Sequence, residues 1–516
     1  MASLRPLARR EFLAGSLALS GTPVLASHHQ DLAVGKLPLE VTNRKQLFID
    51  RRFIDVSDAV TLSLNQAQKM GIVLNSADTS LEAGLGGFFR VIEDAGKFKM
   101  YYGAFTQAGH SLCYAESTDG LKWNRPSLGI VQVNGSKNNN LIVADNAIDA
   151  TIMVDPHDVP QRRYKLFRSS LSSDPKHAGI HASYSADGIH FTEVGRVFPM
   201  WPETSIVADW DTRIGKYVVF LRGFVRNNEN QRRIARIETD DLLKPWPYNH
   251  NVPVISPPSP EHIAVVLSAD QADDPYCDFY TSGAHVYTAA QDVYLMFPTP
   301  FRHFSPSPGR QPWFRFEPGN DYGLIEVQMA VSRDGINWSR PDRRPYFPMG
   351  FPDEWDRWLN IMGCGMVRKG NYIYQYFWSP GRVHDGGILR KEYDHSVPNG
   401  SAYGAVRQRV DGFMSADFAY TGGSLTTPPM VFTGTQLQLN IDTGGMGTAF
   451  VEIQDSTGRA IPGFAHADCE EIGGNYLDTV VRWKGSADLR PLAGKTIRLH
   501  VSGRGTRLYA FQFVSI

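Results

Sequence analysis

The chain has 516 residues, too many for one ordinary hydrophobic core, so two or more structural units are expected. Apolar residues make up 42% and charged residues 20%, and the 47 glycines and 32 prolines suit short strands joined by many turns. The net charge of −1 excludes the strongly basic surface that nucleic acid or an anionic membrane would attract, so a neutral partner is expected.

The first 26 residues have the pattern of a twin-arginine export signal. Arg9 and Arg10 precede an apolar run from Leu13 to Val24, and a small-residue cleavage site follows. We therefore expect residues 1–26 to be a signal peptide and the protein to be periplasmic or extracellular. No later run approaches the roughly 20 apolar residues that a membrane-spanning helix requires, so no membrane span is expected.

An aromatic and apolar strand pattern then recurs five times at wide spacing. Each copy follows a turn that carries glycine or charge, as the second strand of a hairpin should. The first aromatic residues of the copies are separated by 66, 53, 77 and 78 residues, and each interval fits one four-stranded sheet with its loops. These reference residues are Phe98, Tyr164, Tyr217, Tyr294 and Tyr372.

A second pattern, Ser-x-Asp-Gly-x-x-aromatic, follows the first at a similar offset. The Asp-Gly pair favours a tight turn, because glycine accepts positive φ and aspartate bonds its own backbone. We expect the aromatic residue to pack between neighbouring sheets, so that the motif is structural. The copies span residues 117–123, 185–191 and 332–338, with a degenerate copy at Thr239–Asp241 and Trp246.

Together the repeats predict an all-β fold, with a five-bladed β-propeller over residues 45–410. We expect Leu47–Asp50, ahead of the first blade, to pair with the last sheet and close the ring. From about Asp411 the repeat gives way to period-two alternation, which predicts a C-terminal β-sandwich over residues 411–516. A structural brace is the favoured role for this sandwich, and glycan binding is the alternative.

The innermost strand of each blade lines a propeller's central channel, so a ligand at the mouth would meet one strand from every blade. Counting back 14 to 16 residues from each reference aromatic finds an acidic residue in all five blades. The first three lie just before apolar strands, near a channel mouth. These residues are Glu82, Asp149, Glu203, Asp278 and Asp356.

Carboxylates that converge on a channel suit cleavage of a glycosidic bond. One acid protonates the leaving oxygen, and another serves as nucleophile or as base for a water. Nearby aromatic side chains are expected to stack on sugar rings, and nearby arginines to orient carboxylates. The aromatic candidates are Trp201, Trp355, Trp358 and Tyr280, and the arginines are Arg90, Arg168 and Arg222.

Cysteines and histidines show no metal-site spacing. The four cysteines lack a C-x-x-C pair, which predicts buried thiols instead of a zinc site or a disulfide framework. No histidine pair has the spacing of a helical metalloenzyme site, so surface or hydrogen-bonded histidines are expected. No cofactor is expected, while a structural calcium ion bound by oxygens in the channel is left open.

The blades, the Ser-x-Asp-Gly-x-x-Trp turns, the acids that open three inner strands and the C-terminal sandwich resemble the five-bladed glycoside hydrolases. That group includes invertases, levanases, arabinanases and β-xylosidases, and the chain is also similar to exported bacterial proteins called family-32-like glycosyl hydrolases. The resemblance implies Glu82 as nucleophile or base, Asp149 as modulator of the acid's pKa, and Glu203 as general acid.

The sequence departs from the invertase type in three ways. The Asn-Asp-Pro-Asn-Gly signature is absent, Glu82 stands where an aspartate is usual, and no Arg-Asp-Pro occurs in the second blade. The substrate therefore does not transfer with the resemblance.

The expected function is an exported glycoside hydrolase that cleaves an oligo- or polysaccharide at the channel mouth. The alternative is a non-catalytic glycan-binding propeller, in which the same acids and aromatic residues only bind sugar hydroxyls. A third hypothesis, a lyase for acidic polysaccharides, would require tyrosine, histidine and arginine in the channel in place of paired acids.

Overall fold

The computed structural model describes most of the chain from residue 37 onward. The described residues are 37–145, 147, 149–170, 174, 177–200, 202, 204, 206–225, 231–250, 263–303, 323–384 and 401–515. The predicted signal peptide lies outside them. Residues 38–516 form one compact unit.

The described part of the chain is all-β, as the turn-rich composition predicts. Its helices are single 3-10 turns, and none is long and apolar enough to cross a membrane. These turns are η1 (Arg51–Phe53), η2 (Ser76–Asp78), η3 (Pro160–Arg162), η5 (His466–Asp468) and η6 (Arg490–Leu492).

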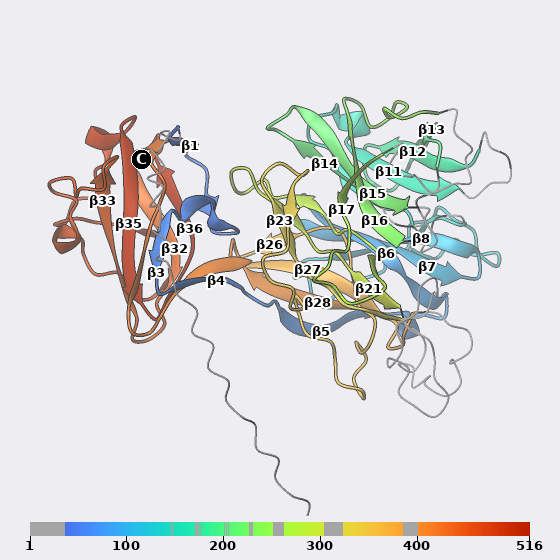
Figure 1. The fold of residues 1–516 in the computed structure, drawn as a ribbon. Helices are drawn as coiled ribbons and strands as arrows, with labels where there is room; N and C mark the ends of the chain where they lie inside the picture. Colours follow the sequence, from blue (N-terminus) through green and yellow to red (C-terminus); the bar gives the residue numbers. More distant parts are fainter. Residues whose placement is uncertain are drawn as a thin grey trace, which may run out of the picture. The chain divides into compact units, whose positions relative to one another are not determined.

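Three antiparallel four-stranded sheets follow one another in chain order, each with neighbouring strands adjacent (Figure 1). Sheet 1 contains β6 (Glu82–Asp94), β7 (Lys97–Thr106), β8 (Gly109–Ser117) and β9 (Leu141–Val143). Sheet 2 contains β10 (Thr151–Val154), β11 (Tyr164–Ser170), β12 (Gly179–Ser185) and β13 (Thr192–Phe198). Sheet 3 contains β14 (Val207–Asp211), β15 (Lys216–Val225), β16 (Gln231–Thr239) and β17 (Ala264–Leu267).

The fourth repeat is split along its strands into two adjoining sheets, here called sheet 4 and sheet 4′. Sheet 4 contains β19 (His285–Val286), β20 (Tyr294–Met296), β23 (Ala330–Ser332) and β24 (Trp338–Ser339). Sheet 4′ contains β18 (Cys277–Phe279), β21 (Pro300–His303) and β22 (Gly323–Ile325).

The fifth sheet combines the end of the repeat region with a strand that precedes sheet 1. Its later strands are β25 (Ile361–Met362), β26 (Val367–Lys369), β27 (Tyr372–Ser379) and β28 (Ala402–Arg409). The outermost position is taken by β5 (Gln68–Asn75), which pairs with β28, so that the blue β5 lies beside the orange β28 in Figure 1. Sheet 5 therefore joins the two ends of the repeat region.

The five repeats contact one another in a closed cycle. Among the first strands, β6 contacts β10, β10 contacts β14, β14 contacts β19, and β26 contacts β6. Each consecutive pair of repeats also shares a hydrophobic cluster, and so do the fifth and the first. Tyr376 and Tyr403 of sheet 5, for example, are buried with Phe89 and Tyr102 of sheet 1. Because burying large apolar side chains is the main favourable term in folding, each sheet depends on both neighbours.

The strand that joins sheet 5 is not the one that the sequence predicts. We expected Leu47–Asp50 to close the ring, whereas Leu47 belongs to β2 (Gln46–Leu47), which pairs with β36 near the C-terminus. The alternating segment of β5 fills that position instead. The reason is burial, since Leu47, Phe48 and Ile49 are almost completely covered, which an outermost strand could not provide.

Two six-stranded sheets contain the C-terminal strands and four strands from before residue 65. One contains β1 (Leu39–Val41), β3 (Val56–Asp58), β30 (Gly423–Thr426), β31 (Met430–Phe432), β33 (Thr448–Asp455) and β35 (Thr496–Arg504). The other contains β2, β4 (Val60–Leu64), β29 (Met414–Phe418), β32 (Gln436–Asp442), β34 (Asn475–Val480) and β36 (Thr506–Val514).

Buried side chains of both C-terminal sheets share one hydrophobic core. Phe432 of the first sheet stacks on Phe513 of the second, with ring centroids 4.0 Å apart. The predicted boundaries differ from this arrangement, because residues 39–64 pair with C-terminal strands although the sequence assigns residues from 45 onward to the repeat region. Tertiary pairing across several hundred residues leaves no local signal in the sequence.

The Ser-x-Asp-Gly motifs are outer turns between the third and fourth strands, as predicted. In the third copy, Asp334 Oδ1 accepts the backbone N–H groups of Ile336 and Asn337 at 2.8 and 2.7 Å. Gly335 has φ +72°, which only glycine adopts without strain. Trp338 then packs edge-on against Phe220 of sheet 3.

The degenerate copy keeps one of the two aspartate bonds and the indole bond, with one extra residue before the tryptophan. Asp241 Oδ1 accepts the backbone N–H of Leu243, and the Trp246 indole donates to the carbonyl of Leu242. The motif therefore ties each sheet to the one before it, and the sequence prediction of a structural role is confirmed for these turns.

Replacing Asp334 with alanine should lower the free energy of unfolding by about 1–3 kcal/mol, because two backbone N–H groups lose a charged acceptor. Urea unfolding measures the change. The matched control is Asp240→Ala, since the Asp240 side chain is 84% exposed and its removal should change the value by less than about 0.5 kcal/mol. Equal stabilities for the two variants would contradict the structural role.

Asp94 provides an acid-sensitive tie between sheets 1 and 2. Burial raises its pKa, but hydrogen bonds from Lys99, Tyr164 and Arg163 outweigh burial and lower it from 3.8 to about 2. A carboxyl whose pKa is lower in the folded state stabilises the protein above its ordinary pKa, and this stability is lost as the pH falls toward 2.

The Asp94→Asn variant should accordingly be less stable than the wild type at pH 7, by about 1–3 kcal/mol. The difference should shrink as the pH falls from about 4 to about 2, where the wild type also becomes protonated. Urea unfolding at several pH values tests this, with exposed Asp58→Asn as the control. A difference that does not depend on pH would contradict the account.

Candidate functional site

We call the end of the repeat sheets at which the first strands begin the start end, and the other the finish end. Glu82 is the first residue of β6, Asp149 lies two residues before β10, and Asp278 is the second residue of β18. The sequence prediction that acids lie at strand starts was made for Glu82, Asp149 and Glu203, and it agrees with the positions of Glu82 and Asp149. Trp201 and Glu203, also predicted for this site, lie outside the described residues.

Glu82 is held in a buried ion pair. Arg125 donates from Nη2 to Oε2 at 2.9 Å and from Nε to Oε1 at 3.1 Å, and the Tyr102 hydroxyl donates to Oε1 at 2.6 Å. Asn140 also bonds the Tyr102 oxygen. The Glu82 side chain has no exposed surface, and its burial raises the pKa of the carboxyl against the opposing effect of Arg125. This geometry does not support the predicted role as base or nucleophile.

Asp149 is also buried at the start end. Its Oδ1 lies 3.4 Å from the backbone nitrogen of Ser169, which precedes the end of β11. The side chain therefore lies where sheet 2 meets the start end, as its position before an apolar first strand predicts.

Arg222 and Asp278, two of the predicted substrate-binding residues, belong to one cluster with Tyr280. Arg222 donates to the Tyr280 carbonyl at 2.8 Å, and its guanidinium lies 4.6 Å from the centre of the Tyr280 ring. Asp278 Oδ2 accepts the Arg232 backbone N–H at 3.0 Å and lies 3.3 Å from His303 Nε2. The structure thus brings residues of sheets 3 and 4′ together.

Aromatic side chains from distant repeats meet at this cluster. Phe88, in an irregular part of β6, stacks on Tyr280 of sheet 4′ with ring centroids 6.4 Å apart and an interplanar angle of 14°. His384 Nε2 lies 3.1 Å from the Tyr280 hydroxyl. Phe88 and Tyr280 are both partly exposed. The sequence singled out Tyr280 as a sugar platform but missed Phe88.

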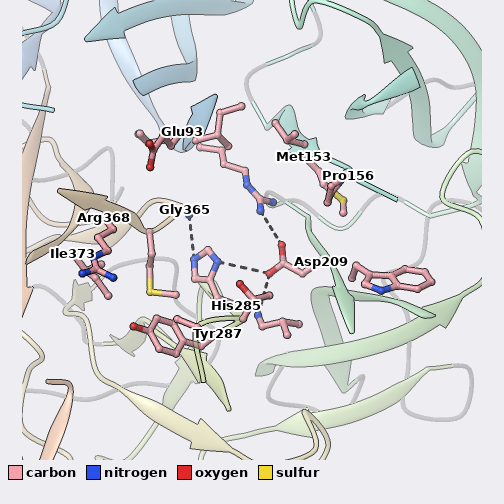
Figure 2. Close-up of a pocket in the computed structure, with 18 of the residues that line it drawn as sticks. Glu93, Met153, Pro156, Asp209, His285, Tyr287, Gly365, Arg368 and Ile373 are labelled. Atoms are coloured by element: carbon pink, nitrogen blue, oxygen red, sulfur yellow. Dashed lines mark hydrogen bonds and ion pairs between the residues drawn. The ribbon is translucent and has the colours of Figure 1, made fainter. Parts of the chain in front are cut away.

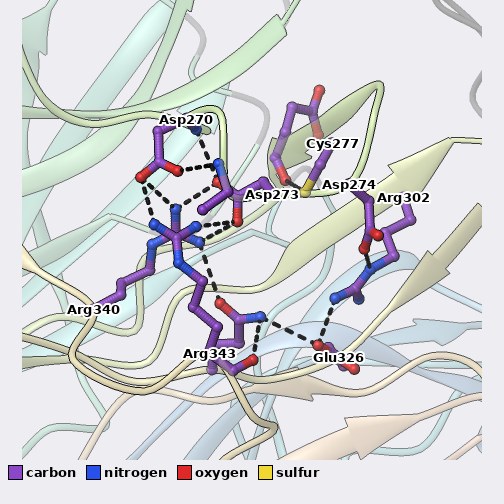
Figure 3. A network of polar contacts seen from close by, with 11 residues as sticks. Asp270, Asp273, Asp274, Cys277, Arg302, Glu326, Arg340 and Arg343 are labelled. Carbon is purple, nitrogen blue, oxygen red and sulfur yellow. Dashed lines mark hydrogen bonds and ion pairs between the residues drawn. The ribbon is translucent and has the colours of Figure 1, made fainter. Parts of the chain in front are cut away.

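An Asp–Arg network holds the segment that leads into β18 (Figure 3). Arg340 and Arg343 both bind Asp270 and Asp273, and Arg343 contacts them at 2.6 and 2.7 Å. Arg302 of β21 binds Asp274 and, at 2.7 Å, Glu326. The hydrogen bond from Arg343 lowers the pKa of Asp270 to about 2. These ion pairs hold the segment from Asp270 to Asp274 in place. They thereby set the position of Asp278, which lies four residues after Asp274.

The other predicted binding residues are engaged elsewhere. Arg168 pairs with Glu193 across sheet 2 at 2.8 Å. Trp355 stacks on Phe377 and contacts the core that sheets 4 and 5 share. The Asp356 side chain is 2% exposed and pairs at 2.8 Å with Lys69 of β5. None of the three joins the Tyr280 cluster among the described residues.

Arg90, the remaining predicted residue, lies midway along β6 in a central network. Its Nη2 donates to Oδ1 of Asp209 on β14 at 2.9 Å. Asp209 Oδ2 accepts the Val286 backbone N–H at 3.1 Å and lies 3.8 Å from Nδ1 of His285. His285 Nε2 in turn accepts the backbone N–H of Gly365. First-strand residues of sheets 1, 3 and 4 and the segment before β26 are thereby linked.

The protonation of His285 follows from these bonds. Because Nε2 accepts a hydrogen bond, the ring proton lies on Nδ1, facing Asp209. Burial lowers the pKa of His285 to about 4, so the ring is neutral at neutral pH. The network is therefore a direct pair of one cation and one anion, with the neutral His285 ring between Asp209 and the backbone N–H of Gly365.

A cavity of about 590 Å³ lies on the finish side of this network (Figure 2). Its lining comes from the ends of the first strands of all five repeats and from Lys45 and Asp411. Trp210 and His157 stack in its wall, with centroids 4.6 Å apart and an angle of 28°. No motif in the sequence indicates this cavity. The one available signal was Asp209, a charge in the middle of a first strand.

The described residues contain no group of three His, Cys, Asp or Glu side chains that could hold a metal ion. The four cysteines are free and buried, as predicted.

No protein-family model and no curated protein match the chain. Among solved structures, an N-acetylgalactosamine deacetylase from F. plautii is 11% identical, with a TM-score of 0.43 over 68% of this chain and 96% of that one. A β-1,2-mannobiose phosphorylase from Listeria innocua is 10% identical, with a TM-score of 0.42 over 66% and 95%. A glycoside hydrolase family 62 α-L-arabinofuranosidase domain from Coprinopsis cinerea is 11% identical, with a TM-score of 0.38 over 67% and 97%. Their reactions differ, and likenesses at these TM-scores fix neither family nor reaction.

Replacing Glu82 with alanine should destabilise the protein by about 3–5 kcal/mol, because Arg125 would remain buried without its counter-charge. The double variant Glu82→Ala/Arg125→Met should recover part of this loss, since it removes both charges. Thermal unfolding compares the variants. A Glu82→Ala variant with wild-type stability would contradict the ion-pair assignment.

Proposed function

We propose that this protein is an exported glycoside hydrolase whose active site lies at the start end of a five-bladed β-propeller with an appended β-sandwich. The closed cycle of five repeats supports the blade count, and the core shared by two six-stranded sheets supports the sandwich. The Arg9-Arg10 pair and the apolar run after it support export.

The observation that carries the proposal is the Phe88–Tyr280 pair beside Arg222 and Asp278. Partly exposed aromatic rings from separate repeats offer flat apolar surfaces for sugar C–H groups, and the buried guanidinium of Arg222 supports the Tyr280 ring. Of the predicted acids, Asp149 lies at this same end, two residues before β10, whereas Glu203 lies outside the described residues. The position of Asp149 beside the proposed binding surface supports the proposal.

Glu203 is the proposed general acid, and Asp149 is proposed to hold its pKa near the working pH. A second carboxylate must activate water or attack the sugar, and the separation of the two sets the stereochemical outcome. Glu82 was predicted for that role, but its covered ion pair with Arg125 favours a positioning role, in which it anchors Arg125 and Tyr102.

The engaged carboxylates also favour a second candidate function. Glu82 and Asp278 both have partners within the protein, which suits a propeller that binds glycans without cleaving them. The two functions share a ligand and differ in whether a product forms.

The test incubates the purified protein with a panel of neutral oligo- and polysaccharides and measures new reducing ends. The hydrolase predicts product from at least one glycan and a loss of about 10²–10⁴-fold in turnover for Glu203→Gln. The matched control is Glu238→Gln in β16, whose side chain is 36% exposed and pairs with Arg236. Binding without product, or full turnover by Glu203→Gln, would contradict the catalytic assignment.

A further inference from the structure

The finish-end cavity has a balanced set of charges. Among its lining residues, Lys45, Arg90 and Arg368 are basic, and Glu93, Asp209 and Asp411 are acidic. His285 adds no charge at neutral pH. Because these charges balance, the lining does not favour an anion or a cation over a neutral molecule. It also offers many hydrogen-bond donors and acceptors.

Two of these charged groups are available to a ligand. Glu93 and Arg368 are exposed, and neither forms an ion pair with another described residue. The other charges are engaged, since Asp209 is held by Arg90, and Asp411 is held by Lys45 at 2.5 Å and by the Tyr287 hydroxyl at 2.7 Å. Figure 2 shows Glu93 and Arg368 on the cavity wall, apart from the His285–Asp209 network.

The wall also has an aromatic surface. Trp210 is partly exposed and stacks on the exposed His157. An edge-to-face contact with Tyr217, with ring centroids 4.7 Å apart, fixes its position. Thr212 and Thr288 add exposed hydroxyl groups to the lining. A rigid aromatic group beside separate donors and acceptors matches a molecule with an apolar face and a hydroxylated edge.

We propose that the finish-end cavity is a second saccharide-binding site, specific for neutral sugars and without catalytic activity. Its volume of about 590 Å³ lies within the range of small-molecule pockets. Hydrolysis requires two available carboxylates. Among the acidic residues of this lining, Asp209 and Asp411 form ion pairs, and Glu93 alone has no ion pair with a described residue, so the cavity lacks the second carboxylate. The Arg90–Asp209–His285 network lies between this cavity and the start end, so the two sites are separate.

The site does not depend on the proposed hydrolase function. A protein that cleaves no glycan could still bind sugars here, and a hydrolase could have an empty cavity at this end. The two claims therefore fail in different experiments.

The experiment titrates the full-length protein with methyl glycosides of neutral hexoses and pentoses, and with glucuronate and glucosamine as charged probes. Isothermal titration calorimetry measures affinity. The neutral glycosides should bind more tightly than either charged probe. Arg368→Gln and Glu93→Gln should each weaken binding by about threefold to tenfold, and Trp210→Ala by about tenfold.

The matched control for Arg368→Gln is Arg407→Gln, a partly exposed arginine that lies over the Tyr372 ring and outside the cavity lining. Its affinity should equal that of the wild type. Glu93 and Arg368 are exposed, so their variants keep the test valid even if Trp210→Ala does not fold. Absence of binding, preference for a charged probe, or affinities unchanged by Arg368→Gln and Glu93→Gln would each overturn the proposal.

Discussion

The ion pair between Arg90 and Asp209 is the interaction on which the rest of the structure depends. It lies midway along the first strands, joins sheets that are not neighbours in sequence, and is bridged to His285 and Gly365. Removing one partner of such a buried pair costs about 3–5 kcal/mol, because the other charge stays buried. Both residues also line the finish-end cavity, so the pair connects the framework of the sheets with one of the two ligand sites proposed for this protein.

The acids of this chain show how burial sorts carboxylates into structural and chemical roles. Glu82, Asp209 and Asp356 each form an ion pair with a basic side chain at 2.8–2.9 Å. Their carboxylates therefore stabilise the contacts between strands. Asp94 does the same between sheets 1 and 2, through Arg163 and Tyr164. A glycosidase requires carboxylates whose protons can move to and from a substrate, which a covered ion pair prevents. The proposed chemistry therefore passes from Glu82 to Asp149 and Glu203, which are proposed for it from their positions in the sequence.

Much of the architecture could be predicted from the sequence, and the site only in part. The five reference aromatics begin the second strand of each repeat, because strand alternation and Asp-Gly turns are local signals. The closing strand was mistaken, because β2 and β5 both precede sheet 1 in the sequence and only long-range pairing shows which of them joins sheet 5. Counting back found Asp149 and Asp278, but a position along a strand does not show which cation lies opposite, so the partners Arg125, Lys69 and Arg232 were missed.

The central claim is that glycan cleavage belongs to the start end and a separate binding site to the finish end. A crystal structure of the Glu203→Gln variant soaked with a glycan that the wild type cleaves tests it most directly. The account predicts that the scissile bond of the glycan lies at the start end, beside Phe88 and Tyr280. Any sugar in the finish-end cavity should be a separate molecule. A glycan found only in the finish-end cavity, against Trp210, with nothing at the start end, would contradict the account.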